Sequence, residues 1–223
     1  MPGRLFWRSA DAIGLIIIFR KGVGIMEKGI GQSKRLKLTD ILVTVVIAAV
    51  FGVVYKIWGP MYNIVQPLGL HAEQLIYGMW FIAATFAFVL IRKPGVAVLA
   101  EVAAASIETF FGGEWGVTTL VYGLLQGLGA ELVFAMFRYR LANVWVVSLA
   151  AIGSCVASLL VDSYYGYIES LTFWNYCLLI GLRLLGSVVI AGLFASLLAR
   201  ALEKTGVTSL LRPASRADYD ALA

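Results

Sequence analysis

A few polar and ionisable side chains interrupt long apolar stretches of this sequence, and these residues are the ones best placed to do chemistry. Within the apolar stretches, or at the edge of one in the case of the aspartate, lie Glu101, Glu108, Gln126, Glu131, Asp162 and Arg183. Charged groups inside a bilayer are costly, and they usually face a bundle interior or a water-filled cavity where they serve a function. The pattern therefore predicts a polar pocket inside a membrane protein.

The depth of each polar residue follows from a helix rise of about 1.5 Å per residue. Glu101 and Glu108 are seven residues apart and share a helix face. We predict an outer cluster, open to the outside, that consists of Glu73, Glu108, Trp115, Tyr122, Gln126, Asp162 and Arg183. We predict an inner cluster of Glu101 and Glu131, for which a structural role and a coupling role both stay open.

The outer cluster has more acids than bases, which favours a neutral or cationic ligand over an anionic one. Its tryptophan and tyrosine side chains offer surfaces for stacking and cation–π contacts. A flat, cationic or protonatable heteroaromatic molecule would fit. The alternatives are that the acids only neutralise Arg183 and Arg138, and that the aromatic residues only form an interfacial membrane belt.

The elements that carry these residues are predicted membrane helices. The chain has 223 residues, is 61% hydrophobic and 14% charged, and has a mean hydropathy of +0.87. A water-soluble fold could not bury this much apolar surface, so a soluble globular enzyme is excluded. Six stretches have the length and composition of spans, namely residues 41–57, 75–91, 95–111, 117–137, 142–161 and 176–199.

The distribution of basic residues predicts the orientation. All of the 18 basic residues except Lys56 and Arg183 lie on one side of a six-span topology. By the positive-inside rule both termini are expected in the cytoplasm of a prokaryotic cell, with the chain in the plasma membrane. The net charge of +5 is therefore topological, and no nucleic acid partner is expected.

Three regions follow from this pattern. Residues 1–37 are expected to form an N-terminal cytoplasmic extension, within which translation could alternatively begin at Met26. Residues 38–204 are expected to form the six-helix, all-α membrane domain, and residues 205–223 a disordered cytoplasmic tail.

The sequence lacks the residues that several kinds of chemistry require. The chain has no G-x-x-x-x-G-K-[ST] motif, so it is expected to hold no ATPase of its own, and no cofactor is predicted. Its only histidine, His71, lies in a predicted outer loop, which disfavours a metal site and a serine–histidine intramembrane protease. An intramembrane enzyme that uses Glu101, Glu108 or Glu131 stays as an alternative.

Small residues recur at helical spacing and predict close helix contacts. Gly123 with Gly127, and Ser154 with Ser158, are expected to pack inside the bundle. Ala48 and Gly52 interrupt an otherwise aliphatic first span, where a groove could also seat a partner protein.

Five stretches of the sequence carry a resemblance to a known family. They are residues 73–81 (EQLIYGMWF), 91–95 (IRKPG), 101–108 (EVAAASIE), 126–134 (QGLGAELVF) and 153–162 (GSCVASLLVD). In order and spacing, from about residue 38 to residue 202, the chain resembles the YkoE family, the substrate-binding S components of energy-coupling factor (ECF) vitamin transporters.

The resemblance implies a six-helix S component that binds thiamine or its hydroxymethylpyrimidine precursor from outside. It also implies a transmembrane coupling protein and two ABC-type ATPase subunits as partners, with Ala48 and Gly52 docking the coupling protein. The most recognisable stretch contributes Glu73, Tyr77 and Trp80.

Within such a site, a carboxylate would bond the aminopyrimidine, with Glu108 the first choice and Glu73 the second. Trp80, Trp115 or Tyr122 would stack on a ring, Gln126 would hydrogen-bond from below, and Arg183 would neutralise an acid. A stand-alone permease for a heterocyclic vitamin and a membrane scaffold with the same fold are the alternatives. The residue types do not separate thiamine from hydroxymethylpyrimidine.

Overall fold

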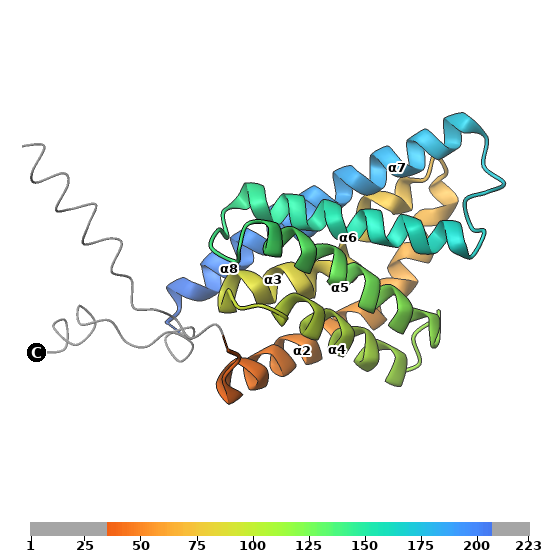
Figure 1. Cartoon of the computed structure of the whole chain (residues 1–223). Coiled ribbons are helices and arrows are strands. Elements are labelled where there is room, and N and C mark those ends of the chain that lie inside the picture. The colour runs from red at the N-terminus through yellow and green to blue at the C-terminus, as the bar shows by residue number, and fades with distance from the viewer. Residues whose placement is uncertain (1–34, 207–223) are drawn as a thin grey trace, which may run out of the picture. The chain divides into compact units, whose positions relative to one another are not determined.

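The computed structural model describes residues 35–206, and this part of the chain is helical throughout, without a β-strand (Figure 1). The predicted N-terminal extension and tail lie almost wholly outside the described residues. The elements are α2 (Leu38–Val65), η1 (Gln66–Leu68), η2 (Ala72–Phe81), α3 (Ile82–Ile91), α4 (Val96–Phe110), α5 (Thr118–Met136), α6 (Val144–Tyr164), α7 (Phe173–Ser187), η3 (Val188–Phe194) and α8 (Ala195–Lys204).

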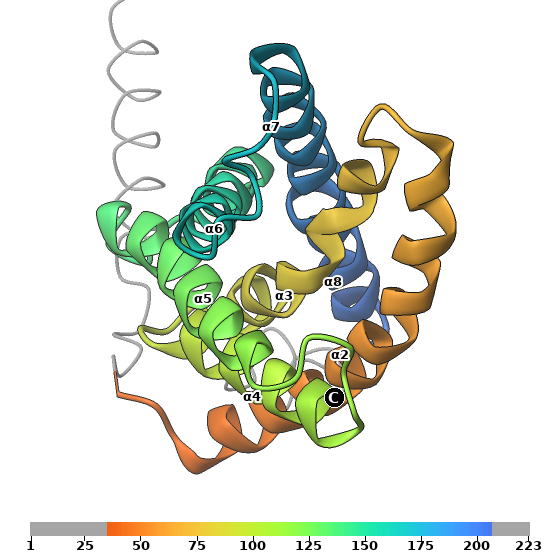
Figure 2. The ribbon, with the colours of Figure 1, turned by 90° about the vertical axis from the view of Figure 1, so that its right-hand side faces the viewer.

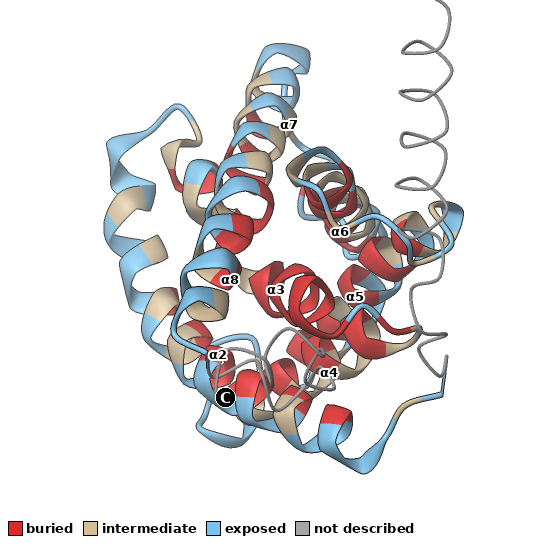
Figure 3. Ribbon diagram, turned by 90° about the vertical axis from the view of Figure 1, so that its left-hand side faces the viewer, coloured by how far each residue is buried: buried red, intermediate tan, exposed pale blue. Residues whose placement is uncertain are grey.

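Helix α3 forms the centre of the bundle. All of its residues, from Ile82 to Ile91, are buried, and Figure 2 shows α2, α4, α5, α6 and α7 arranged around it. The buried residues of the other helices face this centre (Figure 3). A helix that is apolar on every side is expected at such an enclosed position.

Five helical segments of the described part are long and apolar enough to cross a membrane: Leu38–Leu68, Ala72–Ile91, Thr118–Met136, Val144–Tyr164 and Phe173–Lys204. They correspond to five of the six predicted spans. The remaining predicted span contains α4, which has 15 residues and is therefore only about 22 Å long. That is shorter than the hydrocarbon core of about 30 Å.

The carboxylate of Glu131 explains how the short helix α4 begins inside the bundle. It accepts hydrogen bonds from the backbone N–H of Gly95, at 2.6 Å, and of Ala97, at 3.1 Å. The first N–H groups of a helix have no partner within the helix, and a negative charge there also suits the helix dipole.

Outside the helices, burial and the neighbouring Glu131 carboxylate raise the pKa of Tyr139 to about 12.

The second predicted span is a composite, because its first half is the 3-10 helix η2. This tighter helix has three residues per turn, so side chains three apart lie on one line. Its backbone approaches α7 very closely: a Cβ on Gly186 would lie 2.2 Å from the carbonyl oxygen of Leu75, and one on Gly78 would lie 2.8 Å from the carbonyl oxygen of Gly186. Only glycine permits this contact.

The prediction that the first span ends near Ile57 is wrong, because α2 continues through Pro60 to Val65. A proline inside a helix loses one backbone hydrogen bond, so an ending there was the expected outcome. Two contacts join the C-terminal part of α2 to the segment between α4 and α5. Lys56 Nζ donates to the carbonyl oxygen of Gly112, and Asn63 Nδ2 donates to the Glu114 carboxylate at 2.7 Å.

A pair of glycines on α7 tests the close contact with η2. Gly186→Ala should destabilise the protein by about 1–3 kcal/mol, because the new methyl group meets backbone atoms that cannot move aside. Gly181→Ala is the matched control: nothing lies within 4 Å of its Cβ position, so it should be neutral or slightly stabilising. Thermal unfolding in detergent measures both, and equal melting temperatures for the two variants would contradict the contact.

Candidate functional site

One cavity of about 330 Å³ opens toward the end of the bundle where α2 meets η2 and α6 meets α7. All nine residues predicted for the site line it: Glu73, Tyr77, Trp80, Glu108, Trp115, Tyr122, Gln126, Asp162 and Arg183. The structure thus brings the predicted outer cluster together in one place, and the part that each residue plays in binding stays a prediction. The lining also includes residues outside the predicted set, among them Tyr55, Tyr62, Gln74, Glu101 and Thr119.

The helix η2 supplies one wall through residues three apart. Gln74, Tyr77 and Trp80 all line the cavity, as expected for side chains that share one line of a 3-10 helix. Tyr62 of α2 completes an aromatic cluster, with ring centroids 5.2 Å from Trp80 and 6.2 Å from Tyr77. Such a cluster provides edges and faces against which a flat ring can pack.

Glu108 is a buried carboxylate that is held by one oxygen and free at the other. The indole N–H of Trp80 donates to Oε1 at 3.2 Å, whereas Oε2 is buried without a hydrogen-bond partner among the described residues. Thr119, also on the lining, has a hydroxyl oxygen in the same condition. Buried polar atoms are nearly always hydrogen-bonded, so these two orphan atoms, on residues that line the cavity, are the ones we expect a ligand to bond.

Glu73 is the less suitable of the two carboxylates that were predicted to contact a ligand. Its Oε1 accepts from Gln74 Nε2 at 3.1 Å and lies 3.6 Å from His71 Nδ1. This oxygen is therefore engaged within its own segment, at the mouth of the cavity. Glu108 differs in that its second oxygen is buried without a partner among the described residues, so it gains more from a ligand donor.

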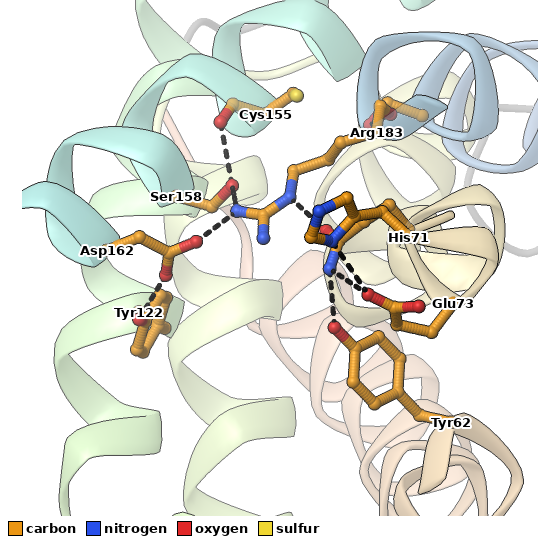
Figure 4. A network of polar contacts seen from close by, with 10 residues as sticks. Tyr62, His71, Glu73, Tyr122, Cys155, Ser158, Asp162 and Arg183 are labelled. Atoms are coloured by element: carbon orange, nitrogen blue, oxygen red, sulfur yellow. Dashed lines mark hydrogen bonds and ion pairs between the residues drawn. The ribbon is translucent and has the colours of Figure 1, made fainter. Parts of the chain in front are cut away.

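Arg183 links three elements across the wall of the cavity (Figure 4). Its guanidinium donates to Asp162 Oδ2 of α6 at 2.5 Å, to Ser158 Oγ of α6 at 3.2 Å, and to Gln74 Oε1 of η2 at 2.7 Å. It also lies 3.9 Å from the ring centroid of Tyr77. The prediction that Arg183 neutralises an acid is confirmed by its ion pair with Asp162.

The other oxygen of Asp162 extends this network to α5, because the hydroxyl of Tyr122 donates to it. Tyr122 and Asp162 are therefore bonded to each other on the cavity wall. A charge-assisted network of this kind fixes the relative positions of helices that pack side by side. Asp162 neutralises the positive charge of Arg183. Arg183 is therefore not the counter-charge of the other carboxylates that line the cavity.

The two acids of the predicted inner cluster have separate hydrogen-bond partners. Glu131 lies at the start of α4 and does not line the cavity. Glu101 lines the cavity, and its Oε2 accepts from the Tyr55 hydroxyl at 3.2 Å and from the backbone N–H of Ala84 at 3.0 Å. The rise per residue predicts how deep each acid lies but not the direction in which it points, so it does not predict that the two acids have different partners.

Ala48 and Gly52 lie in the contact between α2 and α4, not on an open face. Ala48 is fully buried, and a Cβ on Gly52 would lie 2.6 Å from Cβ of Ile107. A partner could not reach these two residues in this arrangement. The corresponding prediction for α5 is confirmed: Gly123 packs against Ala105 and Gly127 against Val98 of α4.

Comparisons with known proteins agree with this architecture. Residues 39–157 match the model of a family described as "ABC-type cobalt transport system, permease component". The chain is 35% identical over 175 residues to the protein YkoE of Bacillus subtilis (strain 168), described as a candidate HMP/thiamine permease; the match covers 78% of this chain and 88% of that protein. The crystal structure of an S-component of an ECF transporter is similar with a TM-score of 0.76 at 34% identity, over 78% of this chain and 89% of that one.

Proposed function

The chain belongs to the YkoE-type S components of ECF transporters, multi-pass proteins of the bacterial plasma membrane, and from this premise we propose that its cavity binds thiamine or hydroxymethylpyrimidine. The observation that carries the proposal is the free oxygen of Glu108 beside the aromatic cluster of Tyr62, Tyr77 and Trp80. A carboxylate next to stacking surfaces suits an aminopyrimidine, which is a flat ring with N–H donors.

The chemistry of the cavity also favours an organic ligand over a metal ion. Cobalt appears in the description of the matching family. Within residues 35–206, however, no group of three or more His, Cys, Asp and Glu side chains is arranged to hold a metal ion. The lining is instead aromatic with a few hydrogen-bonding groups, as in the sites of small organic molecules.

We further propose that the ligand enters from outside the cell. The loops at the opposite end of the bundle from the cavity carry Arg92, Lys93, Arg138 and Arg140. The positive-inside rule assigns that basic end to the cytoplasm, which directs the mouth of the cavity outward.

The energy for transport would come from other subunits, a transmembrane coupling protein and two ABC-type ATPases. The sequence has no phosphate-binding loop of its own. Since Ala48 and Gly52 are buried against α4, the coupling protein would contact other residues.

Uptake of labelled thiamine tests whether transport by this chain needs the coupling protein and the ATPases. In bacterial cells without other thiamine uptake, the chain alone should give no uptake above background, and co-expression with an ECF coupling protein and its ATPases should restore it. Replacement of the phosphate-loop lysines of the ATPases should abolish the restored uptake. Uptake by the chain alone would show a stand-alone permease instead.

A further inference from the structure

The loop between α5 and α6, residues 137–143, exposes two arginines at the end of the bundle opposite the mouth of the cavity (Figure 1). Arg138 and Arg140 are both exposed, and neither forms an ion pair with another described residue. Tyr139 lies between them and is partly buried, with its ring centroid 6.1 Å from that of Phe88. The loop therefore packs one aromatic ring against the bundle and leaves two positive charges at its surface.

The backbone of this loop is strained, and the surrounding structure supports the strain. Arg138 and Tyr139 have φ angles of 55° and 59°, in the left-handed region that residues other than glycine seldom adopt. The N–H of Arg138 donates to the carbonyl oxygen of Ala135 at 2.8 Å. The N–H of Tyr139 donates to the carbonyl oxygen of Phe134 at 2.9 Å. Strained backbone persists where the surroundings fix it and is concentrated at functional sites, so this loop is a candidate for one.

The acids at this end of the bundle are not paired with the two loop arginines. Asp40 forms an ion pair with Lys93 at 2.5 Å. Glu131 accepts hydrogen bonds from the backbone at the start of α4. Glu203 lies on α8, three residues after Arg200. The loop therefore carries two positive charges that no acid of the described residues pairs with.

Large apolar side chains lie within and on either side of the same loop and stay exposed in the folded chain. Met136, the last residue of α5, is 80% exposed, and Trp145, in the first turn of α6, is 81% exposed. Leu141, within the loop, is 46% exposed. In a membrane protein lipid covers such residues, and tryptophan is enriched at the depth of the lipid headgroups. This composition places the two arginines at the depth of the lipid phosphate groups.

We propose that the α5–α6 loop binds the headgroup of an anionic phospholipid through Arg138 and Arg140. The guanidinium group is always charged, and its planar fork suits the oxygens of a phosphate. Anionic lipids give the cytoplasmic leaflet a negative surface, and this end of the bundle faces that leaflet in the proposed orientation. The exposed apolar residues favour a lipid over an acidic protein segment, because a lipid supplies phosphate and hydrocarbon together.

Native mass spectrometry of the full chain in mild detergent, titrated with dioleoylphosphatidylglycerol, tests the proposal. Arg138→Gln combined with Arg140→Gln should weaken binding of this lipid by about tenfold, because each basic residue at an anionic membrane surface adds to the attraction. Arg138→Lys combined with Arg140→Lys keeps both charges and should lose less affinity. The unaltered chain should bind dioleoylphosphatidylcholine more weakly than dioleoylphosphatidylglycerol, because the choline headgroup carries its own positive charge.

Arg200→Gln combined with Lys204→Gln is the matched control. It removes the same charge from two exposed residues of α8, whose C-terminal end lies at the same end of the bundle (Figure 1). It should lower the affinity for phosphatidylglycerol much less than the variant of the loop. Since all four residues are exposed, both glutamine variants should keep the melting temperature of the unaltered chain when no lipid is added.

Three results would overturn the proposal. Equal losses of phosphatidylglycerol affinity in the two glutamine variants would show a general effect of charge. Displacement of the lipid by inorganic phosphate would show a site for a free anion. Unchanged lipid binding in the loop variant, together with lost assembly with an ECF coupling protein and its ATPases, would assign the loop to a protein partner.

Discussion

Glu108→Gln should weaken thiamine binding by about ten- to a hundredfold. The substitution keeps the size of the side chain but removes the charge, and its amide nitrogen replaces an acceptor oxygen. Glu108 has one oxygen held by Trp80 and the other buried without a hydrogen-bond partner among the described residues, so we expect the second oxygen to be the acceptor that the ligand loses. Hydrogen bonds to charged groups contribute about 1.5–3 kcal/mol, which corresponds to this range of affinity.

Two further variants show whether this effect belongs to the site. Glu114→Gln removes an exposed acid nearby that bonds Asn63 and does not line the cavity, and thiamine affinity should be unchanged. Trp80→Phe keeps an aromatic ring but removes the N–H that orients Glu108, so it should give a smaller loss than Glu108→Gln. Titration calorimetry measures all three, and full affinity in Glu108→Gln would show that Glu108 does not contact the ligand.

Arg183→Met should destabilise the fold by about 3–5 kcal/mol, the usual cost of removing one partner of a buried ion pair. Asp162 would keep a buried charge with only the Tyr122 hydroxyl as a partner from this network. Gln74 and Ser158 would also lose their donor, and with it the link between η2 and α6. Thermal unfolding in detergent should therefore show a large drop in melting temperature.

The double variant Asp162→Asn with Arg183→Met distinguishes a coupled pair from two independent residues. Because it leaves no unpaired buried charge, it should be more stable than Arg183→Met alone. If the drop in melting temperature of the double variant equals the sum of the drops in Asp162→Asn alone and Arg183→Met alone, the pair is not coupled. The same cycle measured by thiamine titration reports how far the network also positions the site.

The sequence alone located the site well, for a simple physical reason. In a chain that is so apolar, each charged or amide side chain within a span needs a partner or a cavity, and the structure places the predicted ones around one cavity. The order of the helices did not have to be known for this conclusion. The pairing of Arg183 with an acid followed from the same cost of buried charge.

What the sequence did not reveal depends on backbone geometry. Hydropathy does not distinguish a 3-10 helix from an α-helix, so the alignment of Gln74, Tyr77 and Trp80 on one wall was not predicted. The spacing of three residues was the available signal. Similarly, small residues such as Ala48 and Gly52 predict a close contact but do not identify the helix that makes it, which here is α4.

The separation of Glu101 from Glu131 has the same origin. Both acids bond the first N–H groups of short helices that begin inside the bundle, α3 and α4. The predicted span 75–91 has no helix start at Ile82, so the role of Glu101 there could not be anticipated. The predicted start at residue 95 did not show that Glu131 would bond it. Of the two, only Glu101 keeps an oxygen without a hydrogen-bond partner among the described residues, and this difference appears only when the hydrogen bonds are known.

The central claim is that the cavity of this S component holds a thiamine-type cation through Glu108. Native mass spectrometry of the full chain, purified in mild detergent from cells grown with thiamine, tests it most directly. One thiamine should be bound to the unaltered protein, retained in Glu114→Gln and absent from Glu108→Gln. A protein that carries no ligand, or that keeps thiamine equally well in Glu108→Gln, would contradict it.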